Sequence, residues 1–273
     1  MTQPQSALGP IVVGIDGSDA AITAAKWAVA EAASRDIPLR LLYATRDQHL
    51  ASATGGLDLD LEYGETALRT AAAAIDAMEK AVKVETTVVH GSPAVALIDE
   101  SRDAAMVCVG SVGIGRLAHM LLGSTAAALA EKAHCPVAII RTDQVPPASD
   151  TGWIAVVVGD SPDNDAVLEH GFREARLRNA SILALGVWRW GLGEVPYWKL
   201  DRRLGRWVDC YREVHVRPAA ARAGAAEFLA RTQEPLQLAV VGSHEAAQVA
   251  RIIGRVGHGV FGRAICSVLV ARS

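Results

Sequence analysis

The sequence has few cysteines, no long apolar run and no excess of charge of either sign. Its four cysteines form no CxxC pair, which argues against a disulfide framework or a zinc site. No apolar run approaches the roughly 18 residues of a membrane-spanning helix, and the first residues lack the basic and apolar regions of a signal peptide. Lysine and arginine number 27 against 30 acidic residues, which disfavours nonspecific nucleic-acid binding. These absences predict a cytoplasmic protein with no membrane or nucleic-acid partner.

The common motifs of catalysis are also missing. The sequence contains no GxxxxGK[ST] phosphate loop, no GxSxG turn, no HExxH pair and no carboxylate cluster spaced for two metal ions. His134 and Cys135 combine a base and a nucleophile, but adjacent side chains on an extended chain point apart, which favours a core or edge pair. We therefore assign no catalytic residue and no metal ligand.

What the sequence does contain is an internal repeat. Residues 11–16 and 155–160 are both short apolar runs that end at an aspartate, and residues 31–42 resemble residues 174–185. A stretch rich in proline and serine, residues 144–152, separates the two copies. A repeat of this length is too long for a solenoid and indicates two tandem domains. We expect them to span residues 1–143 and 152–273.

Apolar runs and helical stretches alternate within the first copy. Strands are predicted at about 11–15, 39–44, 84–89, 105–109 and 136–140, and helices at about 19–34, 61–81, 94–103 and 124–133. Runs such as 106–109 show no polar alternation, so both faces of the strand should be covered. The pattern predicts an α/β fold with a doubly wound parallel sheet in each copy, in which ligands bind beyond the carboxyl ends of the strands.

The segment after the fourth predicted strand, residues 110–125, is rich in glycine and leads into a helix that Ser124 or Thr125 can cap. Glycines allow close backbone approach and positive φ, and the start of a helix favours negative charge. The segment therefore fits an anion-binding loop, although a simple connecting turn has the same composition. Arg116 within it fits either a phosphate partner or a solvated surface arginine.

The spacing of this loop resembles a known family. Gly110, two residues, Gly113, nine residues and then Gly123-Ser124 is similar to the G-x2-G-x9-G-[S/T] nucleotide loop of universal stress proteins. The likeness extends to residues 13–18, to Gly91-x-Pro93 and to residues 134–137, so it spans the whole first copy. It looks like the tandem-domain form of mycobacteria and their relatives. The resemblance implies two five-stranded sheets of strand order 3-2-1-4-5 that bind adenine nucleotides.

Carried onto this sequence, the resemblance implies a set of binding residues. Adenosine would lie against Gly14, Ile15, Asp16 and Ala44, and ribose and phosphates against Val109, Gly110, Gly113, Gly123, Ser124 and Thr125. Asp16 also fits a second role, as a turn residue at the entry of a helix. Ala44 stands where the family usually has a bulkier valine, which implies a roomier base pocket.

The second copy departs from the pattern. Asp160 matches Asp16 and Gly242 matches Gly110, but Glu245 stands at the second glycine. Arg255 and Val256 replace the Gly-Ser pair. We therefore expect a degenerate second domain and one nucleotide for each chain. The segment between Trp188 and Trp207 mixes aromatic residues with arginines, which is more typical of an interface than of a base-binding surface.

Three functions remain open at this point. The leading hypothesis is a universal stress protein that binds ATP, with or without magnesium, and acts as a nucleotide-dependent stress-response regulator. The alternatives are a slow ATPase or nucleotide hydrolase, and a dimerisation scaffold that binds no nucleotide. The closing runs of both copies are apolar enough to need cover, which predicts either a homodimer or an intrachain pseudo-dimer.

Overall fold

The computed structural model describes residues 9–45, 56–113, 122–142, 152–187, 197–221, 224–232, 234–253 and 266–273. In the first half strands and helices alternate, as predicted. The strands are β1 (Ile11–Gly14), β2 (Leu39–Thr45), β3 (Val84–His90), β4 (Met106–Gly110) and β5 (Val137–Ile140), and the helices are α1 (Asp19–Arg35), α3 (Gly56–Asp76), α4 (Pro93–Glu100) and α5 (Ser124–Lys132). Helix α3 begins and ends earlier than the predicted range 61–81. It ends before Glu79, whose positive φ of 53° is incompatible with a continuing helix.

The second half repeats the alternation. Its strands are β6 (Trp153–Val158), β7 (Ser181–Val187), β8 (Val216–Ala221), β9 (Leu236–Gly242) and β10 (Ser267–Ala271), and its helices are α6 (Asn164–Leu177), α7 (Tyr197–Cys210), α8 (Ala225–Arg231) and α9 (Val249–Ile252). A 3-10 helix, η1 (Ser243–Gln248), follows β9 directly. In the first half the described residues that follow β4, 111–113, are not helical, so the halves differ directly after this strand.

The described strands form one sheet in the order β3-β2-β1-β4-β5-β10-β9-β6-β7-β8. Each half keeps the predicted order 3-2-1-4-5 with parallel neighbours. The halves join where β5 and β10 pair antiparallel, with Ala138 opposite Leu269. The two predicted five-stranded sheets are therefore continuous. The two apolar closing strands, β5 and β10, therefore cover each other within the chain. Of the two predicted assemblies, this is the intrachain pseudo-dimer.

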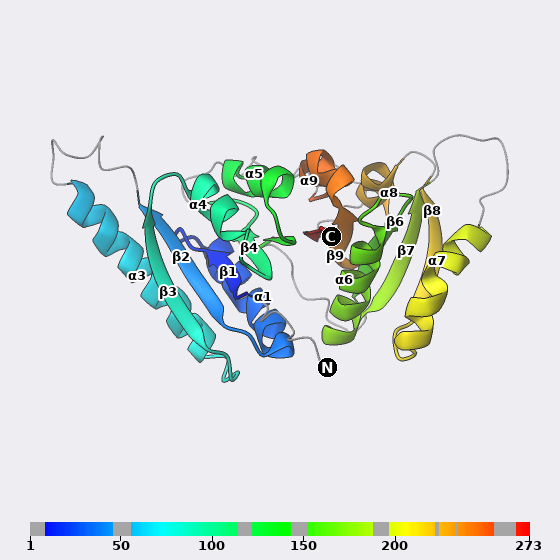
Figure 1. Cartoon of the computed structure of the whole chain (residues 1–273), viewed down its shortest axis with the longest axis horizontal. Coiled ribbons are helices and arrows are strands. Elements are labelled where there is room, and N and C mark those ends of the chain that lie inside the picture. Colours follow the sequence, from blue (N-terminus) through cyan, green and yellow to red (C-terminus); the bar gives the residue numbers. More distant parts are fainter. Residues whose placement is uncertain are drawn as a thin grey trace, which may run out of the picture.

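Helices cover both faces of the sheet. Buried side chains of α1, α3, α6 and α7 form one core, and those of α4, α5, α8 and α9 form the other. Figure 1 shows α3 and α7 at opposite ends of the molecule and the C-terminus near its middle. Val268, Leu269 and Val270 of β10 are fully buried, and each such side chain stabilises the fold by about 1.5–3 kcal/mol.

Two arginines connect the halves on the α5 and α9 side. Arg141 follows β5, and its Nη1 donates to the carbonyl oxygen of Ile253 at the end of α9, at 3.2 Å. Arg272 follows β10 and donates to the carbonyl oxygens of Leu129 and Ala130 in α5. A cation near a helix C-terminus complements the helix dipole. Each half therefore supplies a cation to a helix end in the other half.

The predicted linker, residues 144–152, lies outside the described residues except for Gly152. The domain limits 1–143 and 152–273 therefore stay a prediction. Within the described ranges, no helix has the length and apolar character that crossing a membrane requires.

Candidate functional site

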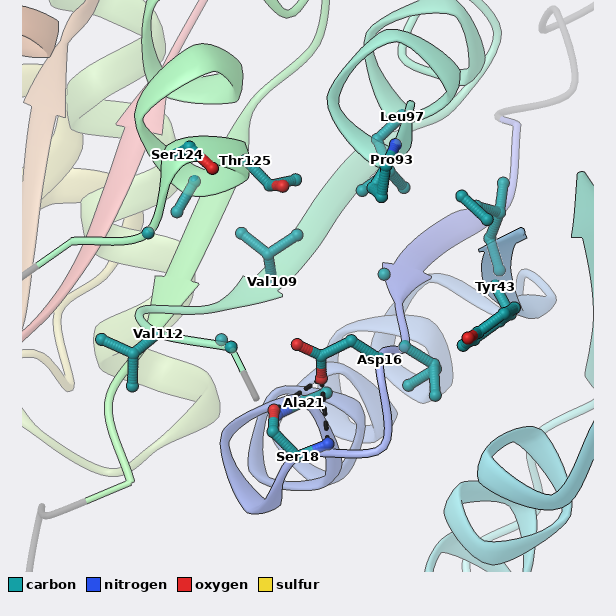
Figure 2. A pocket seen from close by; sticks show the side chains of 18 of the residues that line it. Asp16, Ser18, Ala21, Tyr43, Pro93, Leu97, Val109, Val112, Ser124 and Thr125 are labelled. Atoms are coloured by element: carbon teal, nitrogen blue, oxygen red, sulfur yellow. Dashed lines mark hydrogen bonds between the residues drawn. The ribbon is translucent and has the colours of Figure 1, made fainter. Parts of the chain in front are cut away.

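A cavity of about 780 Å³ opens at the carboxyl ends of β1, β2 and β4. All ten residues named from the sequence line it, together with residues of α3 and α4 that the sequence analysis did not name. Figure 2 shows Ser124 and Thr125 on one side of the cavity and Tyr43 on the other, with Asp16 and Val109 between them. The fold therefore brings together residues that are distant in sequence at the edge of the sheet where ligands of such folds bind.

Asp16 organises the loop after β1. Its Oδ1 accepts hydrogen bonds from the backbone N–H of Ser18 at 2.9 Å and from the Ser18 hydroxyl at 2.6 Å. Ser18 in turn caps α1, because its Oγ accepts from the N–H of Ala21 at 3.2 Å. Asp16 thus takes the predicted helix-entry role and also lines the cavity, so the two interpretations of this residue are compatible.

The other oxygen of Asp16 explains a glycine of the loop. A Cβ placed on Gly113 would lie 2.5 Å from Asp16 Oδ2, so no side chain fits there while the aspartate keeps its position. Gly113 therefore accommodates the close approach of a carboxylate. The loop after β4 and the loop after β1 come close together at this point.

Gly110 is required by close packing against the backbone of α1, and Gly14 lies close to a side chain of α4. A Cβ on Gly110 would lie 2.7 Å from Ala20 Cβ in α1, and one on Gly14 would lie 2.8 Å from Leu97 Cδ1 in α4. The expectation that the loop glycines adopt positive φ is wrong for Gly110, Gly113 and Gly123, because the described glycines with positive φ are Gly17, Gly91 and Gly224.

The start of α5 forms the opposite wall. Gly123 is the N-cap residue, with a φ of −71°, and it supplies no side-chain cap to the first N–H groups of the helix. Residues 123–126 all line the cavity. The first N–H groups of a helix and its dipole favour an anion, and the hydroxyls of Ser124 and Thr125 are further donors. This end of the cavity therefore has the polarity of a phosphate site.

The far wall comes from β2 and α3. The Tyr43 hydroxyl donates to Asp60 Oδ1 at 3.0 Å, and the Tyr63 hydroxyl donates to the backbone oxygen of Asp16 at 3.3 Å. The two tyrosine rings lie 6.2 Å apart between centroids. Ala44, named from the sequence, lies at the end of β2 beside this wall, whereas the Ile15 side chain is buried in the core.

Sequence reasoning missed the contribution of α3. Asp60 and Tyr63 belong to no motif, and the predicted helix began after Asp60. Their spacing of three residues does place them on one helix face, which was an available signal. Arg116 and His119 of the loop lie outside the described residues, as does the rest of segment 114–121.

The matching region of the second half is arranged differently. Asp160, the counterpart of Asp16, forms a salt bridge with Arg203 of α7. Ser161 Oγ lies 3.1 Å from His244 Nδ1, which joins the loop after β6 to η1. Arg255 and Val256 lie outside the described residues.

Two carboxyl groups stand at the end of β9. Asp163 Oδ2 accepts from the N–H of Ser243 at 3.1 Å and from its hydroxyl, and Asp163 Oδ1 accepts from the Ser273 hydroxyl at 3.1 Å. Burial acts to raise the pKa of Asp163, but these hydrogen bonds hold the pKa below its usual value. A Cβ on Gly242 would lie 3.4 Å from Glu245 Oε2 and 3.6 Å from Asp163 Cβ. Among the described residues, two acidic side chains therefore lie close to Gly242, the counterpart of Gly110.

Comparisons with known proteins show the family of the chain. A family model described as the universal stress protein family matches residues 8–141. The chain is 51% identical over 262 residues to Universal stress protein Rv2624c of Mycobacterium tuberculosis, covering 96% of each chain. It is 40% identical to Universal stress protein Rv3134c of the same organism, over 100% of this chain and 99% of that one. A solved universal stress protein from Archaeoglobus fulgidus DSM 4304 matches 97% of this chain and 96% of its own with a TM-score of 0.71 at 16% identity, a likeness of fold.

Proposed function

Because the chain belongs to the universal stress protein family, we propose that its first half binds ATP, with or without magnesium, and that the protein acts as a nucleotide-dependent regulator of the stress response. The observation that carries the proposal is the single cavity in which β1, β2, β4, the loop after β4 and the start of α5 meet. Ten residues chosen from the sequence for nucleotide binding line this one cavity. The site residues, like the ligand, are part of the proposal.

The polarity of the cavity gives the nucleotide one favoured direction. Asp60 contributes a carboxylate to the side nearer β2 and α3, where a phosphate chain would be repelled. Adenine is uncharged and aromatic, and it suits the wall formed by Tyr43, Ala44 and Tyr63. The phosphates would then lie at the start of α5, against Gly113, Gly123 and the hydroxyls of Ser124 and Thr125.

Magnesium fits the donors of this site. Mg²⁺ prefers oxygen ligands and commonly binds through one carboxylate together with substrate phosphates. Asp16 is the carboxylate that faces Gly113, and so the one nearest the proposed phosphate position. When bound, the ion would supply positive charge to the phosphates, and Asp16 would hold it.

A regulator requires binding alone, whereas a hydrolase also needs a group that orients water at the terminal phosphate. The carboxylates that line the cavity are both engaged, Asp16 by Ser18 and Asp60 by the Tyr43 hydroxyl. This engagement favours regulation over rapid hydrolysis. If the wild type hydrolyses ATP and a Gly123 variant loses this turnover, the slow hydrolase is the correct alternative. If the wild type binds no nucleotide, the dimerisation scaffold is correct.

Addition of ATP is expected to raise the melting temperature of the protein. A ligand at 100 times its dissociation constant stabilises the folded state by about 2.7 kcal/mol. For a chain of this size that corresponds to a rise of roughly 5–10 °C. The measurement is a thermal melt with millimolar ATP and magnesium, with magnesium alone as the control. An unchanged melting temperature would contradict the proposal.

A further inference from the structure

Helices α1 and α6 occupy matching places in the two halves, and each carries a glutamate followed four residues later by an arginine. Glu31 pairs with Arg35 in α1, and Glu174 pairs with Arg178 in α6, each with a shortest N–O distance of 2.6 Å. The guanidinium carbon of Arg178 also lies 4.1 Å from the ring centroid of Trp27 in α1. Polar side chains of the two helices therefore meet where the halves join.

The two glutamates are almost entirely buried, each with 1% of its surface exposed. Glu31 Oε2 accepts from Nε and Nη2 of Arg35, and Glu174 Oε2 accepts from Nε of Arg178. Glu174 Oε1 is buried and accepts from no N–H group or hydroxyl among the described residues. The Glu31 carboxyl group is the neighbour of Glu174 across the junction, since a hydrogen bond between the two side chains acts on the pKa of each.

The arginines bind Oε2 of each glutamate, and Glu174 Oε1 is left without a donor, so ionising both carboxyl groups would leave a buried charged oxygen unpaired. A hydrogen bond between them requires a proton on one of the two. We propose that Glu31 and Glu174 share one proton at the junction of the halves, and that loss of this proton weakens the junction. The pair is then a pH-sensitive contact between the two domains, separate from the cavity of the first half.

The surroundings assign the proton mainly to Glu174. Burial raises the pKa of Glu174 to about 8, with Arg178 opposing the rise and Glu31 adding to it. Burial also acts to raise the pKa of Glu31, but the hydrogen bond with Glu174 and the charges of Arg35 and Arg178 hold that pKa below its usual value. The pair therefore carries one negative charge near neutral pH.

Other titratable groups face the pair from α6 and from β4. Burial and the charge of Arg35 lower the pKa of His170 to about 4, with Arg173 adding to the effect, so this imidazole is neutral near pH 7. Burial first, and then the charges of Glu31 and Glu174, raise the pKa of the Cys108 thiol well above its usual value. Neither group gains or loses its charge in the folded protein between pH 6.5 and 8, so among these facing groups the shared proton is the one that titrates in this range.

The pH range of the effect follows from the pKa of Glu174, which differs between the unfolded and the folded protein. An unfolded glutamate releases its proton near pH 4.5, whereas the folded one holds it to about pH 8. The stability gained from the shared proton is therefore complete below pH 4.5 and is lost as the pH rises to 8. The neutral His170 acts in the opposite sense, with stability present above pH 6.5 and lost toward pH 4. The net loss should therefore be visible between pH 6.5 and 8.

The test compares urea unfolding of the full chain at pH 6.5 and pH 8 in three proteins. In the wild type the equilibrium constant for unfolding should rise by up to about tenfold per pH unit. Glu174→Gln keeps the shape of the side chain and offers an amide N–H donor toward Glu31, but it has no titrating proton. The rise of the unfolding constant with pH should therefore disappear in this variant. Glu227→Gln is the matched control, because Glu227 forms an exposed pair with Arg231 at the same spacing. It should keep the wild-type rise, and equal pH dependence in both variants would overturn the proposal.

A second measurement needs no variant. A buried protonated carboxyl group gives an infrared carbonyl band distinct from that of a carboxylate. The folded wild-type protein should show one such band at pH 7, which disappears above about pH 9 because the pKa is exceeded. Absence of the band at pH 7 would overturn the shared proton, even if Glu174→Gln fails to fold.

Discussion

Substitution of Gly123 by glutamate should abolish ATP binding while leaving the fold intact. The new carboxylate would stand at the N-terminus of α5, where we place the phosphates, and would itself interact with the first N–H groups of the helix. Loss of two hydrogen bonds to charged oxygens costs about 3–6 kcal/mol. The affinity should therefore fall by roughly a hundredfold to ten-thousandfold.

Gly123→Ala is the matched control for this variant. A Cβ on Gly123 would lie 3.5 Å from the Ser111 carbonyl oxygen and 3.8 Å from Val112 Cα, which is ordinary contact. With a φ of −71°, the position also accepts a side chain without strain. The alanine variant should bind within about tenfold of the wild type by calorimetric titration. A folded glutamate variant with unchanged affinity would show that the loop is only a connector.

The second large effect concerns stoichiometry: each chain should bind one nucleotide. In the second half, Asp160 forms a salt bridge with Arg203. The counterpart of Asp160 in the first half is Asp16, which lines the cavity. Asp163 and Glu245 lie close to Gly242 at the end of β9, and Glu245 stands at the place of Gly113, where we put the phosphates in the first half. Two carboxylates at that position repel a polyphosphate, which adds to the loss of glycine at Glu245.

Equilibrium dialysis with labelled ATP at saturation measures this number directly. The wild-type chain should bind one equivalent, and Gly123→Glu should bind none. Two equivalents in the wild type, or one equivalent remaining in Gly123→Glu, would show that the second half binds nucleotide. Asp163→Asn serves as a control in the second half, since it should leave the single equivalent unchanged.

Local patterns in the sequence predicted much of the fold. Unbroken apolar runs gave the strands of the first half, and the helices predicted at about 19–34 and 94–103 begin within one residue of α1 and α4. The loop spacing led to residues that do line one cavity, because Gly113 and Gly123 follow a strand and precede a helix in a fold whose ligand edge is known from topology.

What the sequence did not predict depends on contacts between distant segments. Tyr63 lines the cavity because α3 packs against the loop after β1, and no local motif records that contact. The sequence repeat showed that Glu31 and Arg35 are matched by Glu174 and Arg178. It could not show that the two glutamates meet, since the meeting requires the antiparallel pairing of β5 with β10.

The central claim is that nucleotide binds in the cavity of the first half, and hydrogen exchange with and without ATP tests it most directly. Peptides that contain residues 110–113 and 123–126 should exchange more slowly when ATP and magnesium are present. Peptides from Gly242 through η1 should be unaffected, because that end of the second half is lined by Asp163 and Glu245. Protection confined to the first-half segments is the predicted result. Protection in the second half alone, or none in residues 110–113 and 123–126 at saturating ATP, would contradict the account.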